Sequence, residues 1–384
     1  MSNERIERRF VPALTGIRGI AALWVVLAHV PSPVHIVFPS SEFGNLQLIK
    51  TSYLGVDLFF ILSGFVLSFV YSKSFAESGL RASSAFYSGR ILRVWPLNFV
   101  ALCLVALVAV FIPILEKVTH DLPSFIASIF LVQQWVYHRG TIWNIPAWSL
   151  SAEAFAYVVF PIISIAVGRI RSALALVVLM CGSLALFGAS NWYLHGNEVG
   201  LNVANWGAFS RCLCEFTAGV LLFHAMINSE LSPGARRLIE IFSVIVLCLG
   251  IWTPVTILAP LAFCGLIFSC FKGGYIEYLF SRRIVLWLGT ISFSLYLTHW
   301  LVLSIFEYEA VSLNVVNWHF WVKIILAICC GATILSVAHI TYKFIENPSH
   351  QLAKYITRRT RSESKLPSEK AAYAVADERV ERVL

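Results

Sequence analysis

Residues 13–30 read ALTGIRGIAALWVVLAHV, an apolar stretch close to the ~20 residues that a helix needs to cross a bilayer. Two ionisable residues, Arg18 and His29, interrupt this stretch. At 100° per residue they share one helix face, roughly 16 Å apart along the axis. Ionisable groups inside a membrane span are costly and rare, so this pair marks the helix as a candidate functional site.

The composition of the whole chain is that of an integral membrane protein. Of its 384 residues, 58% are hydrophobic and only 13% are charged, whereas a soluble domain carries about 25% charged residues. The fold class that follows is all-α, a polytopic bundle of about ten transmembrane helices. The predicted spans are 13–30, 53–72, 94–115, 151–168, 172–190, 209–227, 238–252, 254–271, 285–306 and 319–345. The apolar stretch 123–137 is too short for a span and is predicted to form a re-entrant or interfacial helix.

The basic residues indicate how the chain is oriented. The net charge is +8, and most of the 29 lysines and arginines fall on the N-terminal side of the membrane when the spans alternate. The positive-inside rule then places both termini in the cytoplasm. We divide the chain into a cytoplasmic N-terminus over 1–12, a transmembrane domain over 13–345 and a basic cytoplasmic tail over 346–384. The polar composition of that tail predicts disorder or a helix loosely bound to the membrane surface. Because membrane orientation accounts for the basic excess, no nucleic-acid partner is expected.

The nine cysteines give no sign of a metal centre. They lie in predicted spans, and none of them forms a CxxC pair. We therefore expect neither a disulfide framework nor a metal site, and interpret the cysteines as small apolar packing residues.

His29 is the leading candidate for the chemistry. A neutral imidazole near pH 7 can remove a proton from a hydroxyl nucleophile. The alternative is a core histidine bonded to a neighbouring carbonyl. Asp57, in the stretch GVDLFF over 55–60, lies near the external end of the second span. It can orient the imidazole as the third group of a triad, or it is a helix-start carboxylate favoured by the helix dipole.

Arg90 and Arg93 begin the third span on its cytoplasmic side. A spacing of three places both side chains on one helix face. Two guanidinium groups at a cytoplasmic opening suit a polyanion such as the phosphates of coenzyme A, and Arg18 can join them. The alternative is plain positive-inside anchoring.

Two further stretches carry polar residues at the external side. Residues 148–153 read WSLSAE, where a serine can cap the following helix and Glu153 falls in its first turn. In the stretch LGTISFSLYLTH over 288–299, Tyr296 and His299 share a face at i, i+3. They either line an acceptor site or bond to neighbouring helices.

Taken in order, these stretches resemble the membrane-bound acyltransferase-3 family over roughly residues 10 to 350. The resemblance rests on an Arg, ten intervening residues and His in the first span, and on GVDLFF in the second. It rests further on an Arg-x-x-Arg before an aromatic-Pro pair at 90–96, on WSLSAE and on the late Gly, Ser, Tyr, Leu and His pattern. Many relatives have a second acid directly after Glu153, where this chain has Ala154.

The resemblance implies an O-acyltransferase of the cytoplasmic (inner) cell membrane. It implies transfer of an acyl group, usually acetyl, from cytoplasmic acetyl-CoA to a hydroxyl of an extracytoplasmic or lipid-linked carbohydrate, such as an exopolysaccharide or a lipopolysaccharide. The catalytic group would comprise His29, Asp57 and Glu153, and the donor site Arg18, Arg90 and Arg93. The acceptor site would comprise Trp148, Ser149, Tyr296 and His299.

A proton-coupled transporter of a small solute is the competing interpretation. Several spans with buried ionisable groups would also suit that function. Inverted sequence repeats are typical of such transporters, and the sequence contains none that we detect.

Overall fold

The computed structural model describes residues 11–112, 121–136, 143–195, 207–253 and 258–363. Every regular element within these ranges is helical, which confirms the all-α prediction. The long helices are α2 (Pro12–His29), α5 (Leu54–Ser78), α6 (Ser83–Ala109), α9 (Trp148–Gly168), α10 (Ala173–His195), α11 (Gly207–Ile227), α12 (Pro233–Trp252), α13 (Leu258–Lys272), α16 (Ser292–Ser312), α17 (Phe320–Thr341) and α18 (Asn347–Glu363). The shorter α-helices are α3 (Pro31–Val37), α4 (Gln47–Lys50), α7 (Leu122–Ile129), α8 (Gln133–Val136), α14 (Tyr275–Phe280) and α15 (Arg283–Thr290).

The helices form a polytopic membrane bundle, but with fewer clear spans than the ten predicted. Six stretches of the described residues are long and apolar enough to cross a membrane, or seven if α15 and α16 form one broken span. One of the six, Leu54–Ala109, contains both α5 and α6. The helix α13 is only 15 residues long, and the start of the predicted span 254–271 lies outside the described residues.

Large apolar side chains cover the outside of the bundle. Leu174, Ile284 and Ile328 are each more than 60% exposed, which a soluble surface rarely tolerates in such numbers. Inside, small residues let helices approach closely. A Cβ atom on Gly64 of α5 would meet the Phe216 carbonyl oxygen of α11 at 1.9 Å, so only glycine permits this crossing.

The stretch predicted as re-entrant or interfacial forms two short helices, α7 and α8. Leu131, between them, has a φ of 58°, so the chain turns there and does not continue as one helix. Gln133 and Gln134 of α8 are buried, and the Gln133 side chain donates a hydrogen bond to the Ala147 carbonyl at 2.9 Å. This polar anchoring fits a non-spanning element beside the start of α9.

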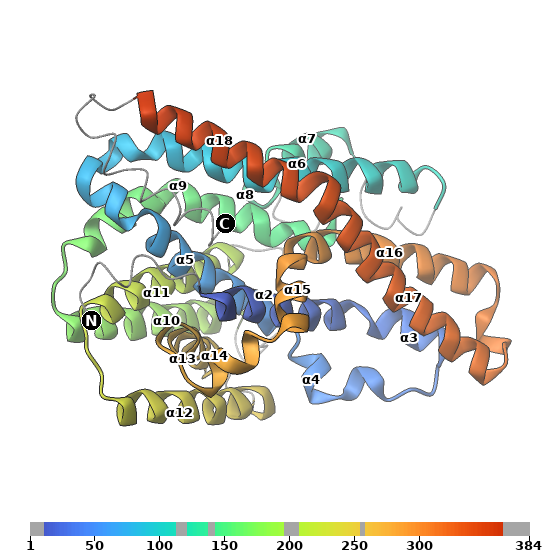
Figure 1. Cartoon of the computed structure of the whole chain (residues 1–384). Helices are drawn as coiled ribbons and strands as arrows, with labels where there is room; N and C mark the ends of the chain where they lie inside the picture. Colours follow the sequence, from blue (N-terminus) through green and yellow to red (C-terminus); the bar gives the residue numbers. More distant parts are fainter. Residues whose placement is uncertain (1–10, 113–120, 137–142, 196–206, 254–257, 364–384) are drawn as a thin grey trace.

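The tail is the largest departure from the prediction. A π-helical turn, η6 (Tyr342–Glu346), joins α17 to α18, and α18 packs along α6 (Figure 1). Of the two alternatives for the tail, disorder does not hold for Asn347–Glu363, which form a helix packed against α6. Residues 364–384 lie outside the described part. The helix forms because one buried contact face on α18, which includes Ala353, outweighs a polar average composition.

Candidate active site

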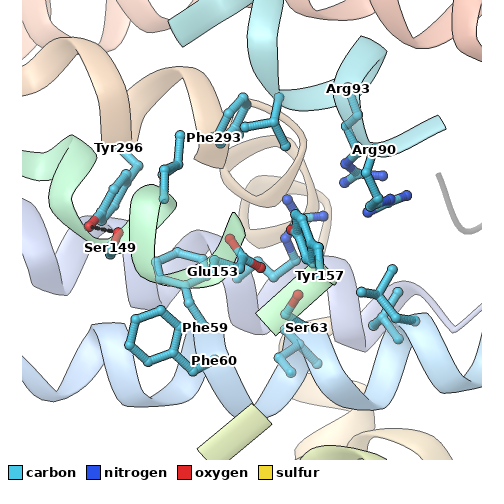
Figure 2. A pocket seen from close by; sticks show the side chains of 16 residues that line it. Phe59, Phe60, Ser63, Arg90, Arg93, Ser149, Glu153, Tyr157, Phe293 and Tyr296 are labelled. Carbon is cyan, nitrogen blue, oxygen red and sulfur yellow. Dashed lines mark hydrogen bonds between the residues drawn. The ribbon is translucent and has the colours of Figure 1, made fainter. Parts of the chain in front are cut away.

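A cavity of about 110 Å³, open at its mouth, lies between five helices in the described part of the chain. Its walls come from α2, α5, α6, α9 and α16, which are distant in sequence but adjacent in the bundle. The residues that line it are Arg18, Phe59, Phe60, Leu62, Ser63, Val66, Leu67, Arg90, Arg93, Val94, Ser149, Leu150, Glu153, Tyr157, Phe293 and Tyr296. Figure 2 shows Arg90 and Arg93 towards one end, Ser149 and Tyr296 towards the other, and Glu153 and Tyr157 between them.

The arginine end gathers the three cations that the sequence predicted for one site. Arg90 and Arg93 are one helical turn apart on α6, and Arg18 comes from α2. Arg90 is buried, its guanidinium lies 5.9 Å from the Tyr71 ring centre, and its Nε has no hydrogen-bond partner among the described residues. The three guanidinium groups carry more positive charge than the nearby carboxylates Glu153 and Glu346 balance, which favours a further anionic partner. This end of the cavity therefore fits a polyanion.

The middle of the cavity is acidic and phenolic. Glu153 and Tyr157 are four residues apart on α9, so they share a face, and Tyr157 interacts with both Glu153 and Ser63. Sequence reasoning selected Glu153 and missed Tyr157 and Ser63. The i, i+4 spacing from Glu153 was the available signal for Tyr157, while Ser63 joins the site only through the α5–α9 packing.

At the far end, two predicted acceptor residues meet. The Ser149 hydroxyl lies 2.6 Å from the Tyr296 hydroxyl, and Tyr296 donates to the Pro146 carbonyl at 2.9 Å (Figure 2). Trp148, the third predicted acceptor residue, lies elsewhere. Its ring packs edge-on against Phe60 and faces the Arg211 guanidinium at 5.9 Å.

The two histidines of the predicted site form a pair. His299 Nε2 lies 3.2 Å from His29 Nδ1, and their ring centres are 5.1 Å apart. His299 is fully buried and its Nδ1 lies 3.0 Å from the Leu295 carbonyl oxygen. Neither histidine is among the described residues that line the cavity, but Tyr296 connects the two regions. The Tyr296 ring lines the cavity and lies 6.2 Å, centre to centre, from the His299 ring.

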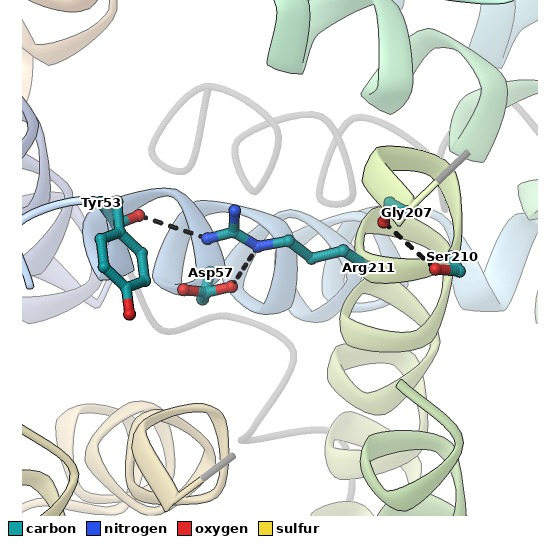
Figure 3. A network of polar contacts seen from close by, with 5 residues as sticks. All are labelled: Tyr53, Asp57, Gly207, Ser210 and Arg211. Carbon is teal, nitrogen blue, oxygen red and sulfur yellow. Dashed lines mark hydrogen bonds and ion pairs between the residues drawn. The ribbon is translucent and has the colours of Figure 1, made fainter. Parts of the chain in front are cut away.

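Asp57 is placed differently from the expectation that it orients His29. Its Oδ1 accepts a hydrogen bond from Arg211 Nε at 2.5 Å, in an ion pair that is almost completely buried. Arg211 also donates to the Tyr53 carbonyl at 3.3 Å (Figure 3). The structure therefore pairs Asp57 with Arg211 and His29 with His299. Arg211 was missed because the sequence gives no contact between α5 and α11.

A second acid that sequence reasoning missed is Glu346, at the end of the π-helical turn. It is 2% exposed, and its Oε2 accepts hydrogen bonds from the Ser294 hydroxyl at 2.6 Å and the Ser294 backbone N–H at 3.2 Å. Ser294 lies in the first turn of α16, so Glu346 caps the helix that carries Tyr296 and His299. Glu346 also interacts electrostatically with Arg18 and Arg93. One carboxylate thus links the arginine end to α16.

Comparison with known families gives the geometry a context. The family described as "Acyltransferase domain" (Acyl_transf_3) matches residues 11–337, which span the cavity and both histidines. The chain belongs to the acyltransferase-3 family. This acyltransferase is 24% identical over 377 residues to a peptidoglycan O-acetyltransferase, OatA, of Listeria monocytogenes, with 90% of the chain and 56% of the relative covered. No solved structure matches this chain.

Two further relatives carry related descriptions. The acyltransferase is 23% identical to a putative O-acetyltransferase of Staphylococcus aureus, with 89% of this chain and 58% of the relative covered. It is 22% identical to a putative peptidoglycan O-acetyltransferase, YrhL, of Bacillus subtilis, with 91% and 56% covered. The chain therefore spans a little over half the length of these relatives. Family membership favours an enzyme over the transporter alternative.

Proposed function

We propose that this acyltransferase transfers an acetyl group from cytoplasmic acetyl-CoA to a hydroxyl of an extracytoplasmic carbohydrate, of peptidoglycan type or linked to a lipid. The observation that carries the proposal is a single cavity with three arginines at one end and the Ser149–Tyr296 pair at the other. Donor and acceptor need such a cavity because they come from opposite sides of the membrane. The names of the relatives support acetyl as the acyl group.

The sidedness of the bundle supports the same arrangement. The proposal places the chain in the cytoplasmic membrane. Both termini are then cytoplasmic, because basic residues concentrate on the side of the N-terminus. Arg18 and Arg90 then lie towards the cytoplasmic ends of α2 and α6. His29 and Asp57 lie at the opposite ends of α2 and α5. Coenzyme A phosphates bind at the first side, and the acceptor approaches from the second.

The donor site gives a direct prediction. Exchanging Arg90 and Arg93 together for alanine removes two charge-assisted contacts to phosphate, each worth roughly 1.5–3 kcal/mol. We expect CoA affinity to fall at least tenfold, measured by titration of the purified variant. The control is alanine at Arg282 and Arg283, a pair of adjacent, exposed basic residues outside the cavity. Unchanged CoA affinity in the Arg90/Arg93 variant would show that the two arginines only orient the chain in the membrane and do not bind the donor.

The hydrogen bonds of the histidine pair select one tautomer for each ring. Because the Leu295 carbonyl can only accept, His299 Nδ1 carries the proton and its Nε2 is an acceptor. His29 Nδ1 therefore donates, both to His299 Nε2 at 3.2 Å and to the Val25 carbonyl at 3.2 Å. This leaves His29 Nε2 unprotonated. The unprotonated nitrogen is the one that a general base requires.

The proposed reaction then balances without a further reactant. An acceptor hydroxyl gives its proton to His29 Nε2 as its oxygen attacks the thioester carbonyl. A C–O bond forms, the C–S bond breaks, and the departing thiolate takes that proton from His29 Nε2, so that free CoA leaves and the neutral imidazole is restored. His299 acts through His29 as a positioning residue, since its Nε2 accepts the hydrogen bond that fixes the tautomer. The Ser149 and Tyr296 hydroxyls, which are hydrogen-bonded to each other and to the Pro146 carbonyl, line the acceptor end of the cavity.

The role of His299 can be tested by exchange for alanine and for glutamine. Loss of the acceptor at Nε2 allows the His29 ring to rotate, so His299→Ala should lower kcat by on the order of 100-fold with KM little changed. A glutamine side-chain oxygen can accept from His29 Nδ1, so His299→Gln should recover part of the activity. The control is His339→Ala, an exposed histidine of α17. Equal losses in the alanine and glutamine variants would exclude tautomer selection.

A further inference from the structure

A second cavity, of about 250 Å³, lies between α10, α11, α12 and α13 and shares no lining residue with the catalytic cavity. Almost all of its wall is apolar, with contributions from Val177, Met180, Leu222, Ala225, Met226, Ile239, Phe242, Val246, Leu261, Ala262 and Phe268. A charged or strongly polar ligand would lose its hydration there without compensation. The cavity therefore fits a hydrocarbon chain.

The surroundings of α12 determine which hydrocarbon can reach this cavity. Phe242 lines it and is 61% exposed, so the cavity opens at the surface of the bundle. Next to this opening, Leu238, Ile245 and Leu249 of α12 are also exposed. In a membrane protein, an exposed apolar helix face of this kind is suited to contact with the acyl chains of the bilayer. The hydrocarbon available at the opening is consequently a lipid acyl chain.

Two cations lie at one end of the cavity. Arg236 is one turn before Ile239 on α12, and its Nε donates to the carbonyl of Leu231, a lining residue, at 3.1 Å. Lys272 is one turn after the lining residue Phe268 on α13 and interacts electrostatically with Arg236 and with Glu230. The two cations repel each other. Glu230 offsets part of their charge, while the Glu240 carboxylate of α12 accepts a hydrogen bond from the Ile276 backbone N–H. A phosphate group between Arg236 and Lys272 would relieve that repulsion.

We propose that this cavity is a binding site for one glycerophospholipid from the adjacent leaflet. One acyl chain occupies the apolar cavity, and the phosphate lies between Arg236 and Lys272. Net-anionic headgroups are favoured over zwitterionic ones, because the positive charge of a zwitterionic headgroup would be repelled by these two cations. The site is independent of acyl transfer, since it touches none of the residues that line the catalytic cavity.

Native mass spectrometry of the full chain tests the proposal. The protein is purified in detergent, exposed to vesicles of phosphatidylglycerol or of phosphatidylcholine, and examined for retained lipid. We expect one phosphatidylglycerol per chain, and less phosphatidylcholine. The double variant Arg236→Gln, Lys272→Gln should retain about tenfold less phosphatidylglycerol, from the loss of charge-assisted contacts. Arg237→Gln, an exposed neighbour on α12, should retain as much as the unaltered protein.

A second variant tests the acyl-chain part of the site. Ala225→Phe fills the cavity and should abolish retention of both lipids, whereas Ala327→Phe, on the exposed face of α17, should not. If Ala225→Phe does not fold, Leu261→Trp fills the same cavity from α13. The proposal is overturned if the unaltered protein retains no lipid, or if the cavity-filling variant retains as much as the unaltered protein. It is also overturned if inorganic phosphate alone displaces the lipid, or if Arg237→Gln loses as much lipid as the double variant.

Discussion

Acyl transfer by the His29→Ala variant is expected to fall by about 10²–10⁴-fold, the usual contribution of a positioned general base. The reason is that alanine removes the nitrogen, Nε2, that the hydrogen bonds of His299 and Val25 leave unprotonated. CoA affinity should be unchanged, because the arginine end of the cavity does not involve α2 beyond Arg18. Both quantities can be measured on purified protein, as acetyl transfer to a soluble glycan and as CoA binding by titration.

His339→Ala serves as the matched control, because it makes the same exchange at an exposed position of a long apolar helix. It should keep full activity and the same yield of inserted protein. Acetylated product at the normal rate from His29→Ala would contradict the assignment of the base. A parallel loss of CoA affinity would show instead that the exchange disturbs the whole bundle.

The second large effect is on stability, at the buried ion pair of Asp57 and Arg211. Arg211→Met leaves the Asp57 carboxylate buried without its cation and should lower the free energy of unfolding by about 3–5 kcal/mol. Less than a tenth of the surface of each side chain is exposed to solvent, so water cannot replace the lost partner. Thermal unfolding in detergent, followed by the fluorescence of the tryptophans, measures the effect.

The double variant Asp57→Leu, Arg211→Met is the informative partner of this experiment. Replacing Asp57 as well removes the carboxylate that Arg211→Met leaves unpaired. The double variant, in which the buried neighbour Glu215 is unchanged, should therefore be more stable than Arg211→Met alone. The activity of the double variant distinguishes a structural role of Asp57 from a catalytic one. Recovery of activity together with stability shows that the ion pair serves the structure. Recovery of stability without activity would restore Asp57 to the catalytic group.

The membrane class was predictable because it follows from composition and from the length of apolar stretches. The first span, predicted over 13–30, appears as Pro12–His29, and the stretch 123–137 forms short helices that do not span. The number of spans was less predictable. A short helix such as α13 can be as apolar on average as a straight span. The same holds for two helices joined at a bend, such as α15 and α16, which meet at 68°. Only the packing of the neighbouring helices distinguishes them.

The candidate site was predicted in its residue types and only partly in its contacts. The positions of Arg90 and Arg93 on one face followed from helical spacing. Arg18, Glu153, Ser149 and Tyr296, which were also named from the sequence, line the same cavity. Contacts that cross between helices could not be predicted. The partner of Asp57 is 154 residues away in sequence, and His299 is 270 residues from His29.

Sequence by itself determined that this chain is a helical membrane protein, that it resembles acyltransferases, and which ionisable residues lie in its spans. These properties depend on hydrophobicity and on the 3.6-residue period, which are local. Tertiary structure alone decided that His299 contacts His29, that Arg211 neutralises Asp57, and that Glu346 caps α16. The physical reason is that helix pairing is set by small residues at crossings, such as Gly64 against Phe216, and a periodic pattern does not specify the partner helix.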